Sequence, residues 1–319
     1  MDANYICDLH SHTVLSDGND TVEELIAAAV KRGVKILALT DHDVLPPKTI
    51  VVDGKTVNTV EYAASKGLLL IPGVEFSTET LIEDTHLVCL GCDWTNKKLK
   101  ELEDEIKQSK VDSYVKLLKR LTEKGMPITF EELMNSKEGL TPDTLQKKLI
   151  FDLMAKKGYA PTWKDAKIML KTHKELSVER EKPDAIRVIK AAHEAGGIVI
   201  LAHPYLIAPI VPFNGKEITR AEFIEILIAN GLDGVEKVYP YDKTSSIEKR
   251  PNEVLYDEVE KLYKGRLLIS GGSDYHNDAK KGTENPRLVG ECGVEKENIN
   301  KILQRVFKDK NFDYEKVIK

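Results

Sequence analysis

The most constraining feature of this sequence is a series of short apolar runs that alternate with segments of helical character. Seven runs are rich in β-branched residues or leucine, and they span residues 5–9, 36–40, 68–71, 86–90, 198–202, 234–238 and 267–270. Such alternation is typical of a parallel sheet whose strands are joined by crossover helices. A capping box at Thr21 and Glu24 and a stop at Gly33 mark the first helix. The 319 residues fit one α/β barrel, with or without an inserted subdomain.

Residues 96–182 interrupt this alternation between the fourth and the fifth run. They have helical character and hold 20 Lys and Arg against 15 Asp and Glu, a net charge of +5 that leaves −10 for the remainder. We therefore expect a helical subdomain at 96–182, inserted into a barrel of residues 1–95 and 183–319. We expect it to leave the barrel where the carboxyl ends of the strands gather, and its basic surface to border the site there. Four lysines at helical spacing could form that surface or simply face solvent: Lys164, Lys167, Lys171 and Lys174.

Composition limits the classes of protein that this chain can belong to. A hydrophobic fraction of 41% and a charged fraction of 31% are those of a globular protein. No apolar run reaches the roughly 18 residues of a membrane span, and no signal peptide is recognisable, so we expect a cytoplasmic protein without membrane contact. Cys89 and Cys92 form a lone Cys-x-x-Cys pair, which favours structural thiols over a zinc or redox site. The net charge of −5 disfavours strong binding to duplex nucleic acid.

Side chains of the kinds that bind metal ions lie at the ends of the apolar runs. His10 and His12 follow the first run, where strand alternation places them on one side of the backbone. Five of the seven predicted strands end in such residues, and a sixth begins with His86. Because the carboxyl ends of parallel strands converge, we expect one shared site there. Buried unpaired groups of this kind would be costly without a cation, so the pattern indicates a metal centre. His173 and His193 lie in polar helical contexts and are expected at the surface.

The order of these motifs resembles that of the PHP (polymerase and histidinol phosphatase) phosphoesterases. The resemblance covers residues 5–95 and 185–295 and rests on Asp8-Leu9-His10-Ser11-His12-Thr13, Ser16-Asp17-Gly18, Leu39-Thr40-Asp41-His42-Asp43, Gly73-Val74-Glu75, Ala202-His203-Pro204 and Gly272-Ser273-Asp274-Tyr275-His276. It implies a distorted (β/α)7 barrel and two or three divalent transition-metal ions. One ion would be held by His10, His12, Glu75 and Asp274, a second by Glu75, His86 and His203, and a third by Asp17, His42 and His276. A mixed nitrogen and oxygen site suits Mn, Fe or Zn.

The activity implied by the resemblance is hydrolysis of phosphoric esters by a metal-bound hydroxide. The motifs around Asp17 and His42 are more similar to those of nucleotide-directed members, which favours a nucleoside 5′-phosphate, a 3′,5′-bisphosphate or a short RNA 5′ end as the substrate. Histidinol phosphate or another small phosphoester remains an alternative. A metal-dependent C–N hydrolase and a non-catalytic metal-binding partner module are further alternatives.

Several residues receive roles beside the metals. His203 and Asp274 are the candidates for the acid that protonates the leaving group. Asp8, Asp41 and Asp43 flank the proposed ligands and are expected to orient imidazoles. Lys237 and Arg287 are candidates for contacts to the substrate phosphate, although a residue chosen in this way can equally be an ordinary surface cation.

Overall fold

The computed structural model describes residues 2–244 and 248–317. The chain divides into two compact units, Met1–Glu103 with Pro183–Lys319, called the barrel unit here, and Asp104–Lys182, called the insertion. The predicted division into a barrel of residues 1–95 and 183–319 and an inserted helical subdomain of residues 96–182 stays a prediction.

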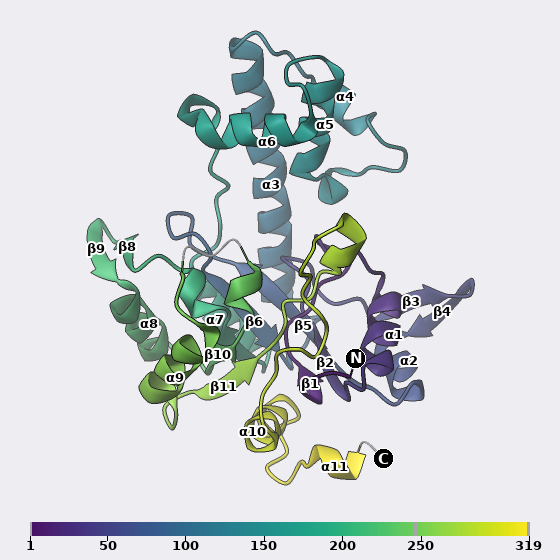
Figure 1. Cartoon of the computed structure of the whole chain (residues 1–319), viewed down its shortest axis with the longest axis vertical. Coiled ribbons are helices and arrows are strands. Elements are labelled where there is room, and N and C mark those ends of the chain that lie inside the picture. The colour runs from purple at the N-terminus through teal and green to yellow at the C-terminus, as the bar shows by residue number, and fades with distance from the viewer. Residues whose placement is uncertain (1, 245–247, 318–319) are drawn as a thin grey trace. The chain divides into compact units, whose positions relative to one another are not determined.

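A seven-stranded sheet forms the centre of the barrel unit (Figure 1). All seven predicted runs form its strands, and most ends agree within two residues. β5 continues to Ser77, so Glu75 lies inside that strand and the prediction that it ends the strand is wrong. In spatial order the strands are β1 (Cys7–Asp8), β2 (Ile36–Leu39), β5 (Leu69–Ser77), β6 (His86–Leu90), β7 (Ile198–Leu201), β10 (Gly234–Val238) and β11 (Leu268–Gly271).

The sheet curves into a nearly closed barrel, and backbone contacts between the segments after β1 and β11 join its edges. The N–H of Leu9 donates to the carbonyl of Gly271 at 3.2 Å, and the N–H of His12 donates to that of Tyr275 at 2.8 Å. A Cβ at Gly272 would lie 2.4 Å from the Cβ of His10, so only glycine permits this approach. The predicted distorted (β/α)7 barrel is thereby confirmed.

One strand runs against the predicted parallel direction. β6 pairs antiparallel with both β5 and β7. Segment 78–85, which joins β5 to β6, is too short for the crossover of a dozen or more residues that a parallel connection needs. As a result, His86 lies at the carboxyl ends of the other strands, and the chain leaves β6 at the opposite end. The prediction that the insertion departs from the carboxyl edge is therefore wrong, although the first turns of the following helix return there, where Glu103 accepts the N–H of Leu45 at 3.0 Å.

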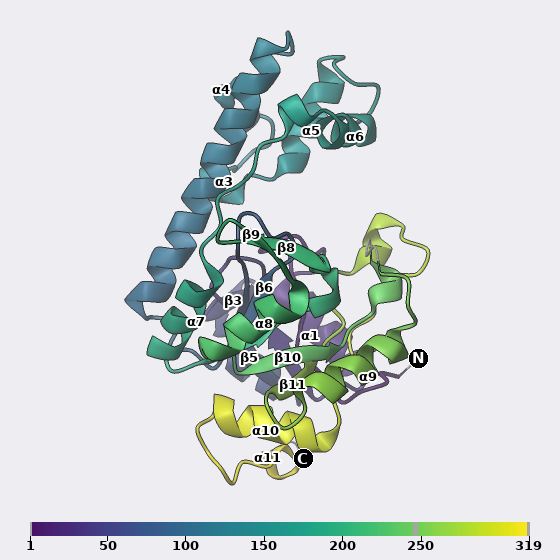
Figure 2. The ribbon, with the colours of Figure 1, turned by 90° about the vertical axis from the view of Figure 1, so that its left-hand side faces the viewer.

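Helices flank the sheet on its outer side. The predicted capping box of α1 is confirmed, since Thr21 and Glu24 bond each other's backbone N–H groups. α10 covers the amino-terminal end of the barrel in both views (Figures 1 and 2), where a Cβ on Gly91 would touch Val306. The helices of this unit are α1 (Val22–Lys31), α2 (Thr59–Ser65), α7 (Ala185–Glu194), α8 (Arg220–Ala229), α9 (Asn252–Tyr263), α10 (Lys296–Val306) and α11 (Tyr314–Val317).

Two antiparallel hairpins of the barrel unit have no counterpart in the sequence prediction. They are β3 (Thr49–Val52) with β4 (Lys55–Asn58), and β8 (Ile210–Phe213) with β9 (Lys216–Thr219). Most of their residues are exposed or half-buried, so they lack the apolar runs by which buried strands are recognised.

The helical character predicted for the insertion is confirmed. Its helices are α3 (Lys97–Glu123, which begins in the barrel unit), α4 (Phe130–Met134), α5 (Lys147–Lys156) and α6 (Trp163–Thr172). They share a core that includes Leu121, Leu133, Ile150, Met154 and Leu170, and every buried member of this core lies between residues 114 and 176. Within the described chain no helix is both long and apolar enough to cross a membrane.

The cysteines behave as structural side chains. All four are buried free thiols, as predicted for Cys89 and Cys92. Burial raises the pKa of the Cys92 thiol to about 12, so it remains protonated near neutral pH.

Candidate metal centre

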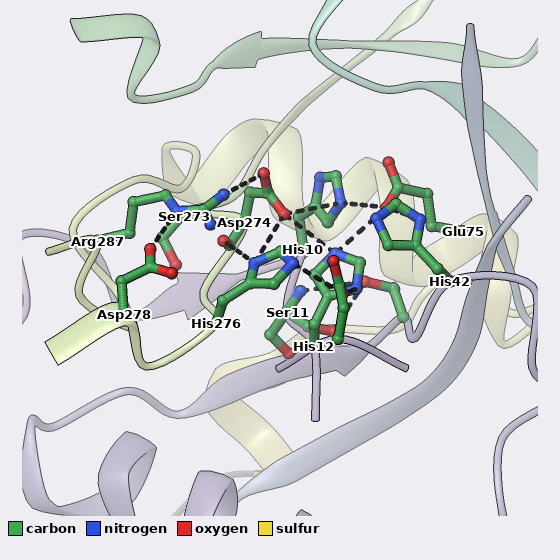
Figure 3. Close-up of polar contacts among 12 residues, drawn as sticks. His10, Ser11, His12, His42, Glu75, Ser273, Asp274, His276, Asp278 and Arg287 are labelled. Carbon is green, nitrogen blue, oxygen red and sulfur yellow. Dashed lines mark hydrogen bonds and ion pairs between the residues drawn. The ribbon is translucent and has the colours of Figure 1, made fainter. Parts of the chain in front are cut away.

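The carboxyl-terminal edge of the barrel gathers the predicted metal ligands into one cluster (Figure 3). His203 adjoins it through Glu75, since its Nε2 lies 3.0 Å from Glu75 Oε1. All nine predicted ligands are therefore neighbours, and the ions that they would hold remain a prediction. Three overlapping groups have ligand atoms within 4.8 Å of one another: His12, Asp17, His42 and His276; His10, His12, Glu75 and Asp274; and His42, Glu75 and His86.

Glu75 lies at the middle of the cluster, with no exposed side-chain surface. Its Oε2 atom is 3.0 Å from His10 Nε2, 3.2 Å from His12 Nε2 and 3.0 Å from His42 Nδ1. Its Oε1 atom faces a second set of imidazoles, with Nδ1 of His86 at 3.1 Å and Nε2 of His203 at 3.0 Å. A carboxylate whose two oxygens face separate sets of nitrogens suits a bridge between two ions.

The hydrogen bonding of Glu75 Oε2 and of the three imidazole nitrogens around it shows whether these residues fit a metal ion. This oxygen, Nε2 of His10, Nε2 of His12 and Nδ1 of His42 are buried and have no hydrogen-bond partner among the described residues, in spite of their short separations. Buried polar atoms without partners are costly, and a divalent cation at their centre would satisfy all of them at once. The donors are nitrogen and oxygen without a thiolate, which suits Mn, Fe or Zn.

Charge within the cluster prepares most of these groups for ligation. Burial opposes ionisation of Glu75, but the neighbouring imidazoles of His10, His42 and His86 hold its pKa well below the usual range. Burial lowers the pKa of His42 to about 4, which leaves this imidazole neutral near pH 7. Burial would also lower the pKa of His12, but the adjacent carboxylates of Asp274 and Glu75 raise it to about 10. His12 must therefore lose a proton before it can bind an ion.

Glu236 is a residue of the site that the sequence analysis missed. Its side chain is 3% exposed, and its two oxygens lie 3.3 and 3.4 Å from Nδ1 of His10. Its Oε2 also accepts the backbone N–H of His203 at 2.8 Å. A carboxylate on the far nitrogen of a ligand histidine fixes the tautomer that exposes the near nitrogen to the metal. One sequence signal could have identified Glu236: it is a carboxylate inside the predicted strand 234–238, the one predicted strand that has no ligand at either end.

Asp274 is oriented by two residues behind it. The Tyr239 hydroxyl donates to Asp274 Oδ2 at 2.8 Å, and the Arg287 guanidinium donates to the same oxygen at 2.5 Å. The other oxygen, Oδ1, lies 3.0 Å from Nε2 of His12. Arg287 is itself held by Asp278 at 2.9 Å (Figure 3). These contacts leave only Oδ1 of Asp274 directed toward the imidazoles.

Asp17 reaches the cluster from a loop at its rim. Its Oδ1 atom lies 3.0 Å from Nε2 of His276 and 3.9 Å from Nδ1 of His12, and its side chain is 59% exposed. Gly18 makes this approach possible, because a Cβ there would lie 2.6 Å from the carbonyl oxygen of His12. The Asn19 amide donates to the carbonyl of His276 at 2.6 Å and so ties the two loops together.

Comparison with known proteins places the chain in a family. The PHP domain model matches residues 8–129. The 5′-3′ exoribonuclease Rnm of Escherichia coli K12 is 30% identical over 281 residues, which are 86% of this chain and 87% of that protein. The chain belongs to the PHP family. A phosphoribosyl 1,2-cyclic phosphate 1,2-diphosphodiesterase of Eggerthella lenta is 26% identical to this PHP chain over 274 residues, covering 84% of the chain and 93% of the relative.

A solved structure agrees with this membership in the PHP family. A protein of Bifidobacterium adolescentis assigned as a metal-dependent phosphoesterase matches with a TM-score of 0.66 and 25% identity. The match covers 94% of this chain and 96% of that protein. The enzyme class predicted from the sequence, a phosphoesterase hydrolase, is confirmed by these relatives.

The acidic residues that flank the ligands of this PHP chain act on the backbone. Asp8 accepts the hydroxyl of Ser273 and three backbone N–H groups, and Asp41 accepts the N–H and the hydroxyl of Thr13. Asp43 accepts a backbone N–H of β5. The prediction that these carboxylates orient imidazoles is wrong for Asp8 and Asp41. The N–H groups of buried loops lack the partners that a strand would supply, and these two carboxylates satisfy them.

The two predicted phosphate contacts of the PHP site differ in position. Lys237 lies 2.6 Å from Glu260 of α9, outside the cluster that the ligands form. Arg287 adjoins the cluster, and its charge faces two carboxylates, as described above. A contact of either residue to substrate stays a prediction. His173 and His193 are exposed, as expected.

Proposed function

We propose that this PHP protein hydrolyses phosphomonoesters of nucleotides, or the phosphorylated 5′ end of short RNA, with two or three divalent transition-metal ions. The observation that carries the proposal is the buried carboxylate of Glu75 between two sets of imidazoles: those that face Oε2 have nitrogens without hydrogen-bond partners among the described residues, and His86 and His203 contact Oε1. The names of the relatives support the substrate class, because one is an exoribonuclease and another acts on a ribosyl phosphate.

The residues divide among the ions as the family resemblance implies. His10, His12, Glu75 and Asp274 would hold one ion, Glu75 with His86 and His203 a second, and Asp17, His42 and His276 a third. Bound divalent ions supply an activated water and neutralise charge on the phosphoryl group.

The remaining steps fall to the side chains. Glu236 holds His10 and the backbone of His203, while Tyr239 and Arg287 fix Asp274, so the site is formed before substrate arrives. Of the two candidate acids, His203 is the one that keeps an atom without a hydrogen-bond partner among the described residues, and we favour it for protonating the leaving oxygen. Its Nδ1 atom is buried and has no partner in the described part of the chain, whereas Oδ2 of Asp274 is occupied by two donors.

The decisive test is phosphate release from a panel of substrates with added Mn²⁺, Fe²⁺ or Zn²⁺. The panel contains a nucleoside 5′-phosphate, a 3′,5′-bisphosphate, a 5′-phosphorylated short RNA, histidinol phosphate and a ribosyl cyclic phosphate. We expect turnover of the nucleotides or the RNA end, loss of turnover on chelation and recovery when metal returns. Preference for histidinol phosphate would mean that this compound, and not a nucleotide, is the substrate. Turnover of amides instead of phosphoesters would favour the C–N hydrolase. Metal binding without turnover of any substrate would favour a partner module.

A cytoplasmic location is also part of the proposal. The four free thiols support it, because a reducing compartment keeps cysteines in this state. The net charge of −5 supports the choice of a small or single-stranded substrate over a duplex.

A further inference from the structure

The helices α5 and α6 of the insertion each have one face in its core and one in solvent. Ile150 and Met154 of α5 and Ala166 and Leu170 of α6 are buried in that core. The other face of α6 is exposed, and it carries Trp163 together with three of the four lysines singled out in the sequence, Lys164, Lys167 and Lys171. Lys174 is also exposed but lies in the turn that follows.

Trp163 is the first residue of α6 and lies at the beginning of this exposed face. The side chain is 38% exposed, and that of Ile168, further along the helix, is 59% exposed. Two ammonium groups approach the indole from different helices. Nζ of Lys148 on α5 lies 5.4 Å from the ring centroid, and Nζ of Lys164 lies 5.8 Å from it. A large aromatic surface and two cations are therefore presented together, and we call Trp163, Lys148 and Lys164 the tryptophan patch.

The cations of this face are not neutralised by the protein. Lys148, Lys164, Lys167 and Lys171 have no carboxylate oxygen within 4.0 Å among the residues that the structure describes. Elsewhere in the insertion Lys157 is paired with Glu132 at 2.5 Å, and Lys116 with Glu181 at 4.0 Å. Asp165 lies on the same helix, but its carboxylate accepts the hydroxyl of Thr162 at 2.6 Å. Unpaired positive charge beside a partly exposed indole suits an anionic partner with aromatic groups.

We propose that the tryptophan patch binds single-stranded RNA, with a base stacked on Trp163 and the flanking phosphates on Lys148 and Lys164. Stacking on aromatic side chains combined with lysine contacts to phosphate is the usual way in which proteins hold single strands. A duplex would keep its bases inside the stack, whereas a single strand can present them. An acidic protein would satisfy the lysines, but a single strand offers a stacking surface at every nucleotide beside its phosphates.

This inference rests on the proposed function and narrows it. The metal centre would act on a phosphorylated end, and a patch that holds further bases and phosphates needs a strand of several nucleotides. The natural substrate would then be an RNA chain with a phosphorylated 5′ end, and a free nucleotide would be only a minimal substrate.

Binding can be measured apart from catalysis, on the whole chain in the presence of a chelator. A fluorescently labelled single-stranded RNA of about 15 nucleotides is titrated, and the anisotropy gives Kd. Trp163→Ala should weaken binding about 5- to 150-fold, the range found for loss of one stacked base, and Trp163→Phe should restore most of it. Lys148→Glu with Lys164→Glu should weaken binding and reduce the slope of log K against log salt by about 1.4, because each phosphate contact on a single strand contributes roughly 0.7.

The matched control is Lys55→Glu with Lys66→Glu in the barrel unit. It changes the net charge equally, both lysines are exposed, and Lys66 also lies beside an aromatic ring, 5.2 Å from the centroid of Tyr62. We expect this variant to bind within about twofold of wild type once the salt dependence common to all surface charge is allowed for. Equal losses in the two charge variants would overturn the proposal, and so would unchanged binding in Trp163→Ala. Displacement of the RNA by polyglutamate of equal charge, with no effect of Trp163, would indicate an acidic protein partner instead.

Turnover of a nucleoside 3′,5′-bisphosphate separates failure of this inference from failure of the proposed function. We expect the tryptophan-patch variants to hydrolyse the bisphosphate at wild-type rates and to lose kcat/KM only on longer RNA. If wild type hydrolyses the bisphosphate but binds no RNA, the inference is wrong and the proposed function stands. If wild type hydrolyses no phosphoester, the proposed function has failed, whatever the RNA titration shows.

Discussion

Replacing Glu236 by Gln tests how much metal affinity comes from a residue outside the proposed ligand set. The substitution keeps the size of a side chain that is 3% exposed, and the amide oxygen can still accept the N–H of His203. It removes the negative charge that lies 3.3 Å from Nδ1 of His10. Partners of this kind typically contribute 10- to 100-fold to metal affinity, which corresponds to about 1.4 to 2.8 kcal/mol. We therefore expect Glu236→Gln to weaken binding at the position held by His10 by one to two orders of magnitude.

Competition between the protein and a chromophoric chelator for Zn²⁺ or Mn²⁺ measures this loss directly. Glu260→Gln is the matched control, because Glu260 of α9 pairs with Lys237 of β10, outside the metal cluster. Circular dichroism and melting of the metal-free proteins show whether both variants fold. The reasoning would be refuted if folded Glu236→Gln bound every ion as tightly as wild type, or if the control lost as much affinity.

Three further predictions concern the ligands themselves. Glu75→Ala should lower occupancy at two metal positions together, because its two oxygens face separate imidazoles; loss of one ion by elemental analysis would mean that Glu75 is a terminal ligand. Asp17→Asn should reduce turnover of nucleotides by roughly tenfold or more with little change in melting temperature, since its side chain is 59% exposed at the rim; a large drop in melting temperature would contradict this. Metal binding at pH 8 should release a proton from His12, because its pKa in the metal-free protein is about 10. The stability that protonated His12 gives the metal-free protein should be complete below about pH 6.5 and lost as the pH rises through about 10. The proton release can be measured by calorimetry of metal binding in buffers with different heats of ionisation. A binding heat that does not depend on the buffer would contradict it.

The barrel could be predicted because its strands are buried on both faces and so appear as continuous apolar runs. β2 and β7 are buried at every residue, and their predicted positions agree with the structure within one residue. The β3–β4 and β8–β9 hairpins escaped prediction because half-exposed polar strands have no such pattern. The direction of β6 was also missed, although the short segment 78–85 contained the information.

The candidate site could be predicted because barrel geometry brings the strand ends together whatever their separation in sequence. The convergence of the strand ends was sufficient to place His10, Glu75 and Asp274 in one shared site, whereas their assignment to a particular ion came from the family resemblance. The supporting contacts follow no such rule. Glu236 meets His10 across 226 residues of sequence, and Tyr239 meets Asp274 only because β10 and β11 are neighbours. Contacts of this kind depend on rotamers and register, which a single sequence does not reveal.

The backbone of the site is held in a strained conformation by contacts within the protein. His203 and Asp274 adopt left-handed conformations, with φ of 28° and 49°, which typically cost about 1–3 kcal/mol each in residues with a side chain. Such strain persists only where the surroundings hold it, and here Glu236 holds the N–H of His203 while Tyr239 and Arg287 hold the carboxylate of Asp274. In the metal-free protein the ionised Glu75 and the protonated His12 partly balance each other's charge within this fixed frame. We therefore expect metal ions to replace protons within the frame that these contacts hold, so that metal affinity falls with decreasing pH as His12 becomes protonated.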